Sequence, residues 1–208
     1  MKIIAHRGND DYQNNNRMKG LLNSLDKDYI DGIEFDVVMT KDGKFILSHD
    51  YLLRTKKQFF NVKNETLKFL KKQKIIKNNK DYPIIELKEF LEKIHSNKIL
   101  LMEFKIDHNE EIFAKKIKPI IKKYKYLNIW LCSFNDKVLS YFKDEYYIGL
   151  IKTRMINQNK GDDYNFLSVN YTEQQKIPYF IWTINHKIEF PKDKNFIGII
   201  TDKPKIFR

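Results

Sequence analysis

The stretch that decides the fold is GIEFDVV, residues 32–38, an apolar run that carries two acidic side chains. Near-continuous apolar residues are typical of a strand that is buried on both faces, as in a parallel sheet covered by helices. Side chains at i and i+2 of a strand point to the same face, so Glu34 and Asp36 are expected to lie together. Buried carboxylates are unfavourable unless they are paired or bind a metal. The run therefore predicts a core strand that carries a site.

Similar short runs recur along the chain and alternate with polar or helix-prone stretches. Eight such runs that alternate with helices are typical of a (β/α)8 barrel. We therefore expect an α/β protein with one barrel domain over residues 1–208. The expected strands are residues 2–5, 32–38, 99–104, 128–132, 146–151, 166–169, 179–183 and 196–200.

The connection after the second predicted strand is unusually long. Residues 41–44, KDGK, form a turn signal, and residues 45–48 follow as a short return strand. The chain then runs on to residue 99 before the next barrel strand, which is long for such a connection. We therefore expect residues 51–96 to form a short helical insertion.

The helices expected elsewhere are uneven in length. Residues 109–124 are long and amphipathic, and residues 87–94 follow Pro83 with acidic residues near their start. Residues 171–177 and 186–194 leave room for about one or two turns of helix. The late helices of the barrel should therefore be reduced.

Composition restricts the location of the protein. Its longest apolar runs are too short to span a bilayer, and the N-terminus lacks the apolar stretch of a secretory signal. The single cysteine, Cys132, allows no internal disulfide, which fits a reducing compartment. We expect a cytoplasmic protein without a transmembrane segment.

The formal net charge of +12 favours anionic partners, namely phosphate esters, acidic lipid surfaces or nucleic acid. The lysines are scattered, however, and the chain has no arginine-rich arm, zinc spacing or RNA-binding motif. An AT-rich genome would also produce a chain rich in Lys, Asn and Ile. We expect no nucleic-acid partner, while peripheral contact with an anionic membrane stays open.

Three carboxylates are expected at the carboxyl ends of neighbouring strands, where barrels carry their catalytic groups. Glu34 and Asp36 lie on the second predicted strand, and Glu103 lies near the end of the third, two residues before Lys105. Three oxygen donors suit a hard cation such as Mg²⁺ or Ca²⁺. The alternatives are that the Glu-x-Asp pair faces solvent and that Glu103 only pairs with Lys105.

Two histidines accompany these carboxylates. His6 follows the first predicted strand beside Arg7 and Gly8, and His49 ends the return strand beside Asp50. Arginine suits phosphate oxygens, and imidazoles titrate near neutrality, so the two histidines could act as general acid and general base. His6 could instead be a core histidine, and Asp50 could orient His49 or cap the following turn.

Together and in order, these motifs resemble the glycerophosphodiester phosphodiesterases. The resemblance extends over nearly the whole chain, to the ends of the fourth and the last two predicted strands. The segments that carry it are HRG at 6–8, DGIEFDV at 31–37, TKDG at 40–43, HD at 49–50, PIIELKEFL at 83–91, EFK at 103–105, SFN at 133–135, WTIN at 182–185 and GIITDKP at 198–204.

The resemblance implies a TIM barrel that hydrolyses a glycerophosphodiester to glycerol 3-phosphate and an alcohol. It implies one divalent cation, Mg²⁺ or Ca²⁺, and a defined role for each residue of the site. The implied roles are metal binding for Glu34, Asp36 and Glu103, acid–base catalysis for His6 and His49, phosphate binding for Arg7 and Lys105, and a pocket wall near the glycerol for Trp182.

One segment departs from the family pattern. The family usually carries Pro-Glu-Asn-Thr after the first histidine, whereas residues 14–17 read NNNR, so that Asn15 replaces the glutamate and Asn16 keeps the asparagine. The alternatives to the main hypothesis are a related lysophospholipase D of the sphingomyelinase D type, a non-catalytic barrel that binds phosphate or another anion, and a basic nucleic-acid binder. The pair at His49 and Asp50 and the lack of a disulfide disfavour the first of these.

Overall fold

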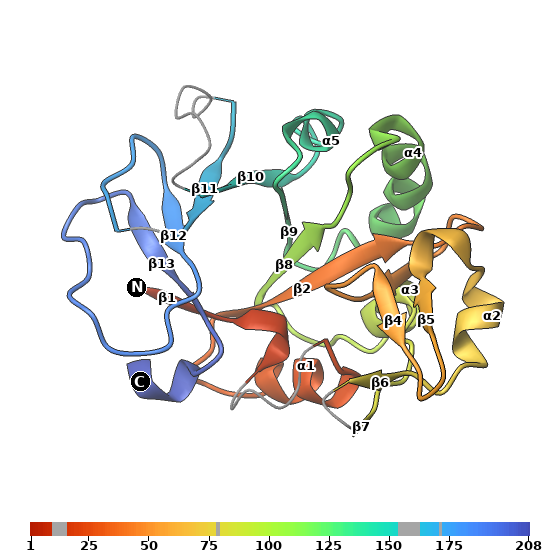
Figure 1. Ribbon diagram of the computed structural model, residues 1–208. Helices are drawn as coiled ribbons and strands as arrows, with labels where there is room; N and C mark the ends of the chain where they lie inside the picture. Colours follow the sequence, from red (N-terminus) through yellow and green to blue (C-terminus); the bar gives the residue numbers. More distant parts are fainter. Residues whose placement is uncertain (10–15, 78–79, 154–162, 171) are drawn as a thin grey trace.

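A closed barrel of parallel strands forms the centre of the computed structural model, which describes residues 1–9, 16–77, 80–153, 163–170 and 172–208 (Figure 1). Nine strands form one sheet, in which eight are parallel and β3 (Phe45–Leu47) runs antiparallel to β2. Pairing of Ile4 with Gly32 closes the barrel. In sheet order the parallel strands are β1 (Lys2–Ala5), β13 (Phe196–Thr201), β12 (Tyr179–Ile181), β11 (Phe166–Val169), β10 (Tyr147–Lys152), β9 (Ile129–Ser133), β8 (Ile99–Phe104) and β2 (Gly32–Met39).

The (β/α)8 prediction is confirmed, and each barrel strand lies where the apolar runs placed it. The largest difference from prediction is in the strand expected at residues 179–183, which ends two residues early, at Ile181. Side chains alternate along each strand between the barrel interior and the outer layer. The interior holds the apolar side chains Ile4, Ile99, Leu101, Cys132, Ile151, Phe166, Phe180 and Ile200.

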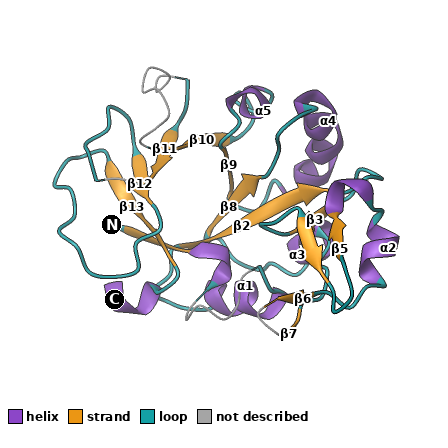
Figure 2. Cartoon of the chain, in the orientation of Figure 1, coloured by secondary structure: helices purple, strands orange, loops and turns teal. Residues whose placement is uncertain are grey.

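The helices lie outside the barrel and cover it unevenly (Figure 2). In the described stretches between β11 and β12 and between β12 and β13 the backbone is not helical, so the reduction of the late helices is stronger than expected. Among the helices of the described residues, none has the length and apolar character of a membrane span. The helices outside the insertion are α1 (Met18–Leu25), α4 (Glu110–Ile121), α5 (Asp136–Ser140) and the 3-10 turns η1 (His6–Gly8), η3 (Lys122–Tyr124) and η4 (Pro204–Phe207).

The insertion at 51–96 is not the helical excursion that its length suggested. It contains two short hairpins and two helices of five residues each. Apolar side chains of the insertion form a small second core with Val38 of β2 and Ile46 of β3, and this packing holds the short elements in place. In that core Phe60 packs edge-on against Phe69 at a centroid distance of 5.2 Å. Its elements are β4 (Leu52–Arg54), β5 (Phe59–Asn61), η2 (Val62–Asn64), α2 (Leu67–Lys71), β6 (Ile76–Lys77), β7 (Lys80–Asp81) and α3 (Leu87–Leu91).

The turn between β2 and β3 forms as the sequence predicts. Gly43 has a φ of 71°, a left-handed conformation that favours glycine, and its N–H donates to the carbonyl of Thr40. The Thr40 hydroxyl donates to Asp42 and accepts from the N–H of Lys44, which fixes the turn. The antiparallel return of β3 brings His49 back toward the carboxyl end of the barrel.

Candidate active site

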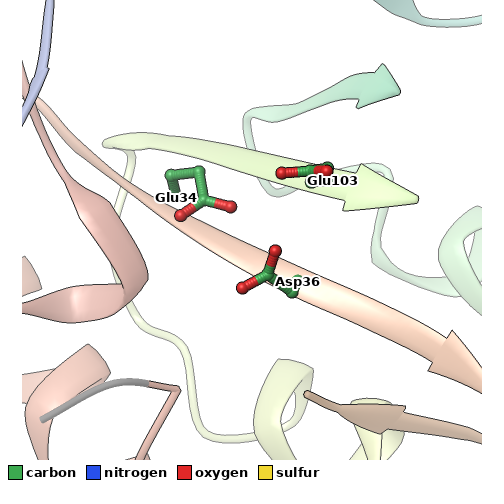
Figure 3. Close-up of side chains that lie close together, drawn as sticks. All are labelled: Glu34, Asp36 and Glu103. Carbon is green, nitrogen blue, oxygen red and sulfur yellow. The ribbon is translucent and has the colours of Figure 1, made fainter. Parts of the chain in front are cut away.

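Three buried carboxylates converge on the neighbouring strands β2 and β8 (Figure 3). Glu34 and Asp36 point from β2 to one face, and the parallel register places Asp36 beside Glu103 on β8. One oxygen of each lies within 4.8 Å of the others, and the residues are 3%, 0% and 8% exposed. The alternative that the Glu-x-Asp pair faces solvent is therefore wrong.

Two cations lie against this carboxylate cluster. The Arg7 guanidinium lies 3.1 Å from an Asp36 oxygen, and the Arg7 backbone N–H donates to Glu34 at 2.9 Å. The Lys105 ammonium lies 3.1 Å from the other Asp36 oxygen and also pairs with Glu103. Arg7 has a φ of 53°, so the chain leaves β1 in a turn that directs both this amide and this side chain at the carboxylates.

Burial and charge separate the pKa values of the three carboxyl groups. Burial, together with repulsion from Asp36, raises the pKa of both Glu34 and Glu103. Burial alone would raise the pKa of Asp36 too, but Lys105 and Arg7 hold it below its usual value. Glu34 keeps one buried oxygen, Oε1, without a hydrogen-bond partner in the described part of the chain. Two cations therefore do not fully compensate three carboxylates, and the oxygen donors fit a divalent cation.

His6 is held by a carboxylate from the last strand. Its Nδ1 lies 2.8 Å from Oδ1 of Asp202. The Asp202 carboxylate also accepts hydrogen bonds from Asn9 at Oδ1 and from Asn185 at Oδ2. Burial by itself would raise the pKa of Asp202, but these contacts, led by His6, lower it to about 2. Because an ionised carboxylate only accepts, Nδ1 carries the hydrogen and Nε2 is directed toward Glu34, 3.8 Å away.

His49 is held in a similar manner by its neighbour in the sequence. Its Nδ1 lies 2.7 Å from Asp50, whose other oxygen lies 3.2 Å from Lys77 Nζ. Burial lowers the pKa of His49, although Asp36 and the hydrogen bond to Asp50 oppose that shift. Of the two open interpretations of Asp50, the structure supports orientation of the imidazole.

A cavity of about 150 Å³ joins these groups. Both histidines, both cations, Glu34 and Glu103 line it together with Ser168 and several apolar side chains. Trp182 forms a wall and meets Phe134 edge-on at a centroid distance of 6.0 Å. All the residues singled out from the sequence thus gather at one site, although Asp36 lies beneath the cavity rather than on its surface.

Asn16 supports the cluster from the loop that departs from the family pattern. Its side-chain amide donates to Asp36 at 2.7 Å and accepts from the backbone N–H of Asp36 at 3.2 Å. Asn16 is fully buried and has a φ of 51°. The neighbouring Asn15 lies outside the described residues, so the effect of this substitution stays untested.

The model of the glycerophosphoryl diester phosphodiesterase family matches residues 6–152, well over half of the chain, and this segment includes both histidines and all three carboxylates. The chain belongs to this family. It is accordingly a phosphoric diester hydrolase, and the resemblance predicted from its motifs is confirmed. A search among curated proteins finds no match.

Solved structures resemble this phosphodiesterase over nearly all of the chain. A glycerophosphodiester phosphodiesterase from Parabacteroides distasonis is 20% identical with a TM-score of 0.79, over 99% of this chain and 94% of that one. One from Thermotoga maritima is 24% identical with a TM-score of 0.75, over 99% and 96%. A phosphodiesterase from Oleispira antarctica, in complex with the product sn-glycerol-3-phosphate, is 20% identical with a TM-score of 0.79, over 98% and 94%. These likenesses support the fold.

Several residues of the phosphodiesterase site received no role from the sequence. Asp202, Asn185 and Asn9 hold His6 or its carboxylate, and Phe134 forms part of the cavity wall. Asp202 directly follows β13, the position at which a barrel strand presents functional groups, and this position was the available signal. The contact from Asn9 has no such signal, because it depends on the turn at Arg7.

Proposed function

We propose that this site hydrolyses glycerophosphodiesters to glycerol 3-phosphate and an alcohol by acid–base catalysis with His6 and His49. The observation that carries the proposal is that both imidazoles line one cavity with a carboxylate cluster and two cations. Each imidazole is also held at Nδ1 by its own carboxylate. That contact leaves each Nε2 available for proton transfer.

Arg7 and Lys105 are suited to bind the phosphate. Both are multivalent donors beside the carboxylates, and a phosphodiester that enters the cavity meets their positive charge. Glu34, Asp36 and Glu103 would hold one divalent cation, Mg²⁺ or Ca²⁺. Such an ion would neutralise negative charge on the phosphate and polarise its oxygens.

The histidines divide the proton transfers. One accepts the proton of the attacking hydroxyl or water as its oxygen bonds to phosphorus. The other donates a proton to the alcohol oxygen as its bond to phosphorus breaks. If a glycerol hydroxyl is the attacking group, the first product is a cyclic phosphodiester, and water opens it to glycerol 3-phosphate through the same two proton transfers. Trp182 supports the glycerol moiety, and its buried indole N–H, which lacks a partner among the described residues, can donate to a hydroxyl. The product in the Oleispira structure, sn-glycerol-3-phosphate, fits this reaction.

The test measures glycerol 3-phosphate released from glycerophosphocholine, glycerophosphoethanolamine and lysophospholipids, with EDTA, Mg²⁺ or Ca²⁺. We expect metal-dependent release from the two glycerophosphodiesters. We also expect a loss of roughly 100-fold or more in His6→Ala and in His49→Ala. His95→Ala, which alters an exposed histidine outside the site, should retain full activity.

Other results would contradict specific parts of the proposal. Activity that survives in both histidine variants would remove the acid–base assignment. Activity that is unaffected by EDTA would remove the metal. Preferential cleavage of lysophospholipids would indicate the sphingomyelinase D type of reaction instead, and absence of any release would leave a barrel that only binds anions.

A further inference from the structure

A second cavity, of about 240 Å³, adjoins the active site at Lys105, which lines both. We call it the flanking cavity. It lies between the insertion, which contributes Tyr51 and Lys63, and the segment after β8, which contributes Asp107. His49, two residues before Tyr51 in the chain, is the more exposed histidine of the active site, with 37% of its side chain accessible against 18% for His6. A bound phosphodiester can therefore extend from the site in this direction.

Basic side chains outnumber acidic ones in the lining of the flanking cavity. Lys41, Lys63, Lys105 and His108 line it with one carboxylate, Asp107, although Lys105 also pairs with Asp36 and Glu103 at the active site. Lys63 is held in place by an ion pair with Asp107 and by the Tyr51 ring, whose centroid lies 3.8 Å from Nζ. This arrangement joins the insertion to the barrel and fixes an ammonium group beside the cavity.

The same arrangement disfavours a quaternary ammonium group. Such a group binds to an open aromatic face, and the Lys63 ammonium already covers Tyr51. Phe113 also lines the cavity, but it is 1% exposed and packs against Phe45 and Phe104 at centroid distances of 5.1 Å. Burial raises the pKa of Tyr51 to about 12, so its hydroxyl stays protonated and can donate to an anion.

We infer that the flanking cavity receives the alcohol moiety of the substrate and selects alcohols that carry a negatively charged group. The inference rests on the proposed function and extends it to the class of substrate. Lys63 is the specificity-determining residue, and Asp107 opposes it. A carboxylate or second phosphate on the alcohol would lie near Lys41 and Lys63, which line the cavity, while Lys105 stays with the carboxylates and the phosphate of the active site.

The test compares glycerophosphoserine with glycerophosphoethanolamine, which differ only by one carboxylate. We expect the wild type to favour glycerophosphoserine in kcat/KM by roughly three- to tenfold at low salt, as one charge contact at a partly hydrated site supplies. The preference should shrink at 0.5 M NaCl because salt screens such contacts. Lys63→Gln should lower the ratio to about one or below, and Asp107→Asn should raise it.

The opposite signs of these two variants distinguish charge selection from structural damage, since both variants break the same ion pair. Lys2→Gln, an equal change of charge at the amino end of β1, is the matched control and should keep the wild-type ratio. Hydrolysis of both substrates at equal rates, or a ratio that falls in both variants, would overturn the inference alone. No hydrolysis of either substrate would overturn the proposed function, and the inference with it.

Discussion

The contact between Asp202 and His6 offers a sharp test of the site. Asp202 accepts three hydrogen bonds, from His6, Asn9 and Asn185, at 2.8 to 2.9 Å. Asp202→Asn keeps the size of the side chain but removes its charge. In either orientation its NH2 group faces a donor, either Asn185 or both His6 and Asn9. We expect the variant to fold and to hold His6 poorly.

The magnitude follows from the hydrogen bond that is lost. A hydrogen bond to a charged group contributes about 1.5–3 kcal/mol, so kcat/KM should fall by roughly 10- to 150-fold. Because the metal and phosphate groups are unchanged, most of the loss should lie in kcat rather than KM. Release of glycerol 3-phosphate from glycerophosphoethanolamine at saturating and limiting substrate gives both constants.

The same substitution has a pH signature in stability. The pKa of Asp202 is lowered to about 2 in the folded chain, below its unfolded value of about 4. The contribution of ionised Asp202 to the free energy of unfolding is therefore fully present above about pH 4 and is lost as the pH falls toward 2. A shift of this size corresponds to about 2.5 kcal/mol, which partial exposure reduces to roughly 1–2 kcal/mol. Asp202→Asn should show a smaller loss of stability between pH 5 and pH 2.5 than the wild type.

Asp144→Asn, which neutralises an exposed carboxylate away from the site, is the control and should match the wild type in rate and stability. The reasoning would be refuted if Asp202→Asn retained wild-type kcat, since His6 would then not depend on this carboxylate. An unchanged acid-unfolding profile would refute the electrostatic part alone.

Three further perturbations test the metal cluster, its support by Asn16 and the turn between β2 and β3. At pH 8 without divalent ions Glu34→Gln should raise the Tm, because burial opposes ionisation of Glu34. Added Mg²⁺ or Ca²⁺ should raise the Tm of the wild type more than that of the variant. A larger metal-induced rise in the Tm of the variant would contradict the metal site. Asn16→Ala removes two hydrogen bonds to Asp36 and should destabilise the fold by about 2–4 kcal/mol in urea unfolding, and a loss below 1 kcal/mol would show that the loop does not support the cluster. Gly43→Ala places a Cβ at positive φ, 2.5 Å from the Lys116 side chain, and should cost about 1 kcal/mol while kcat/KM is retained; lost activity would link this turn to catalysis.

Much of the barrel was predictable from local pattern. Each strand is buried on both faces, so its sequence is an apolar run of strand length, and the alternation of these runs with helices indicates a parallel barrel. The insertion was not predictable in the same manner. Its short hairpins form because side chains such as Phe60 and Leu70 pack against Val38 and Ile46, and such contacts leave no periodic signal in short segments.

The active site shows the same distinction between what local sequence predicts and what tertiary contacts decide. The sequence by itself determined which chemistry is available, because Glu34, Asp36 and Glu103 stand on strands where unpaired acids would be costly, and barrel topology brings the ends of those strands together. Only the tertiary structure decided how these groups are held. Asp202 reaches His6 because β13 pairs with β1, and Asn16 reaches Asp36 from the segment before α1. Such long-range contacts depend on the closed barrel and on single backbone turns, and no local pattern of residues encodes them.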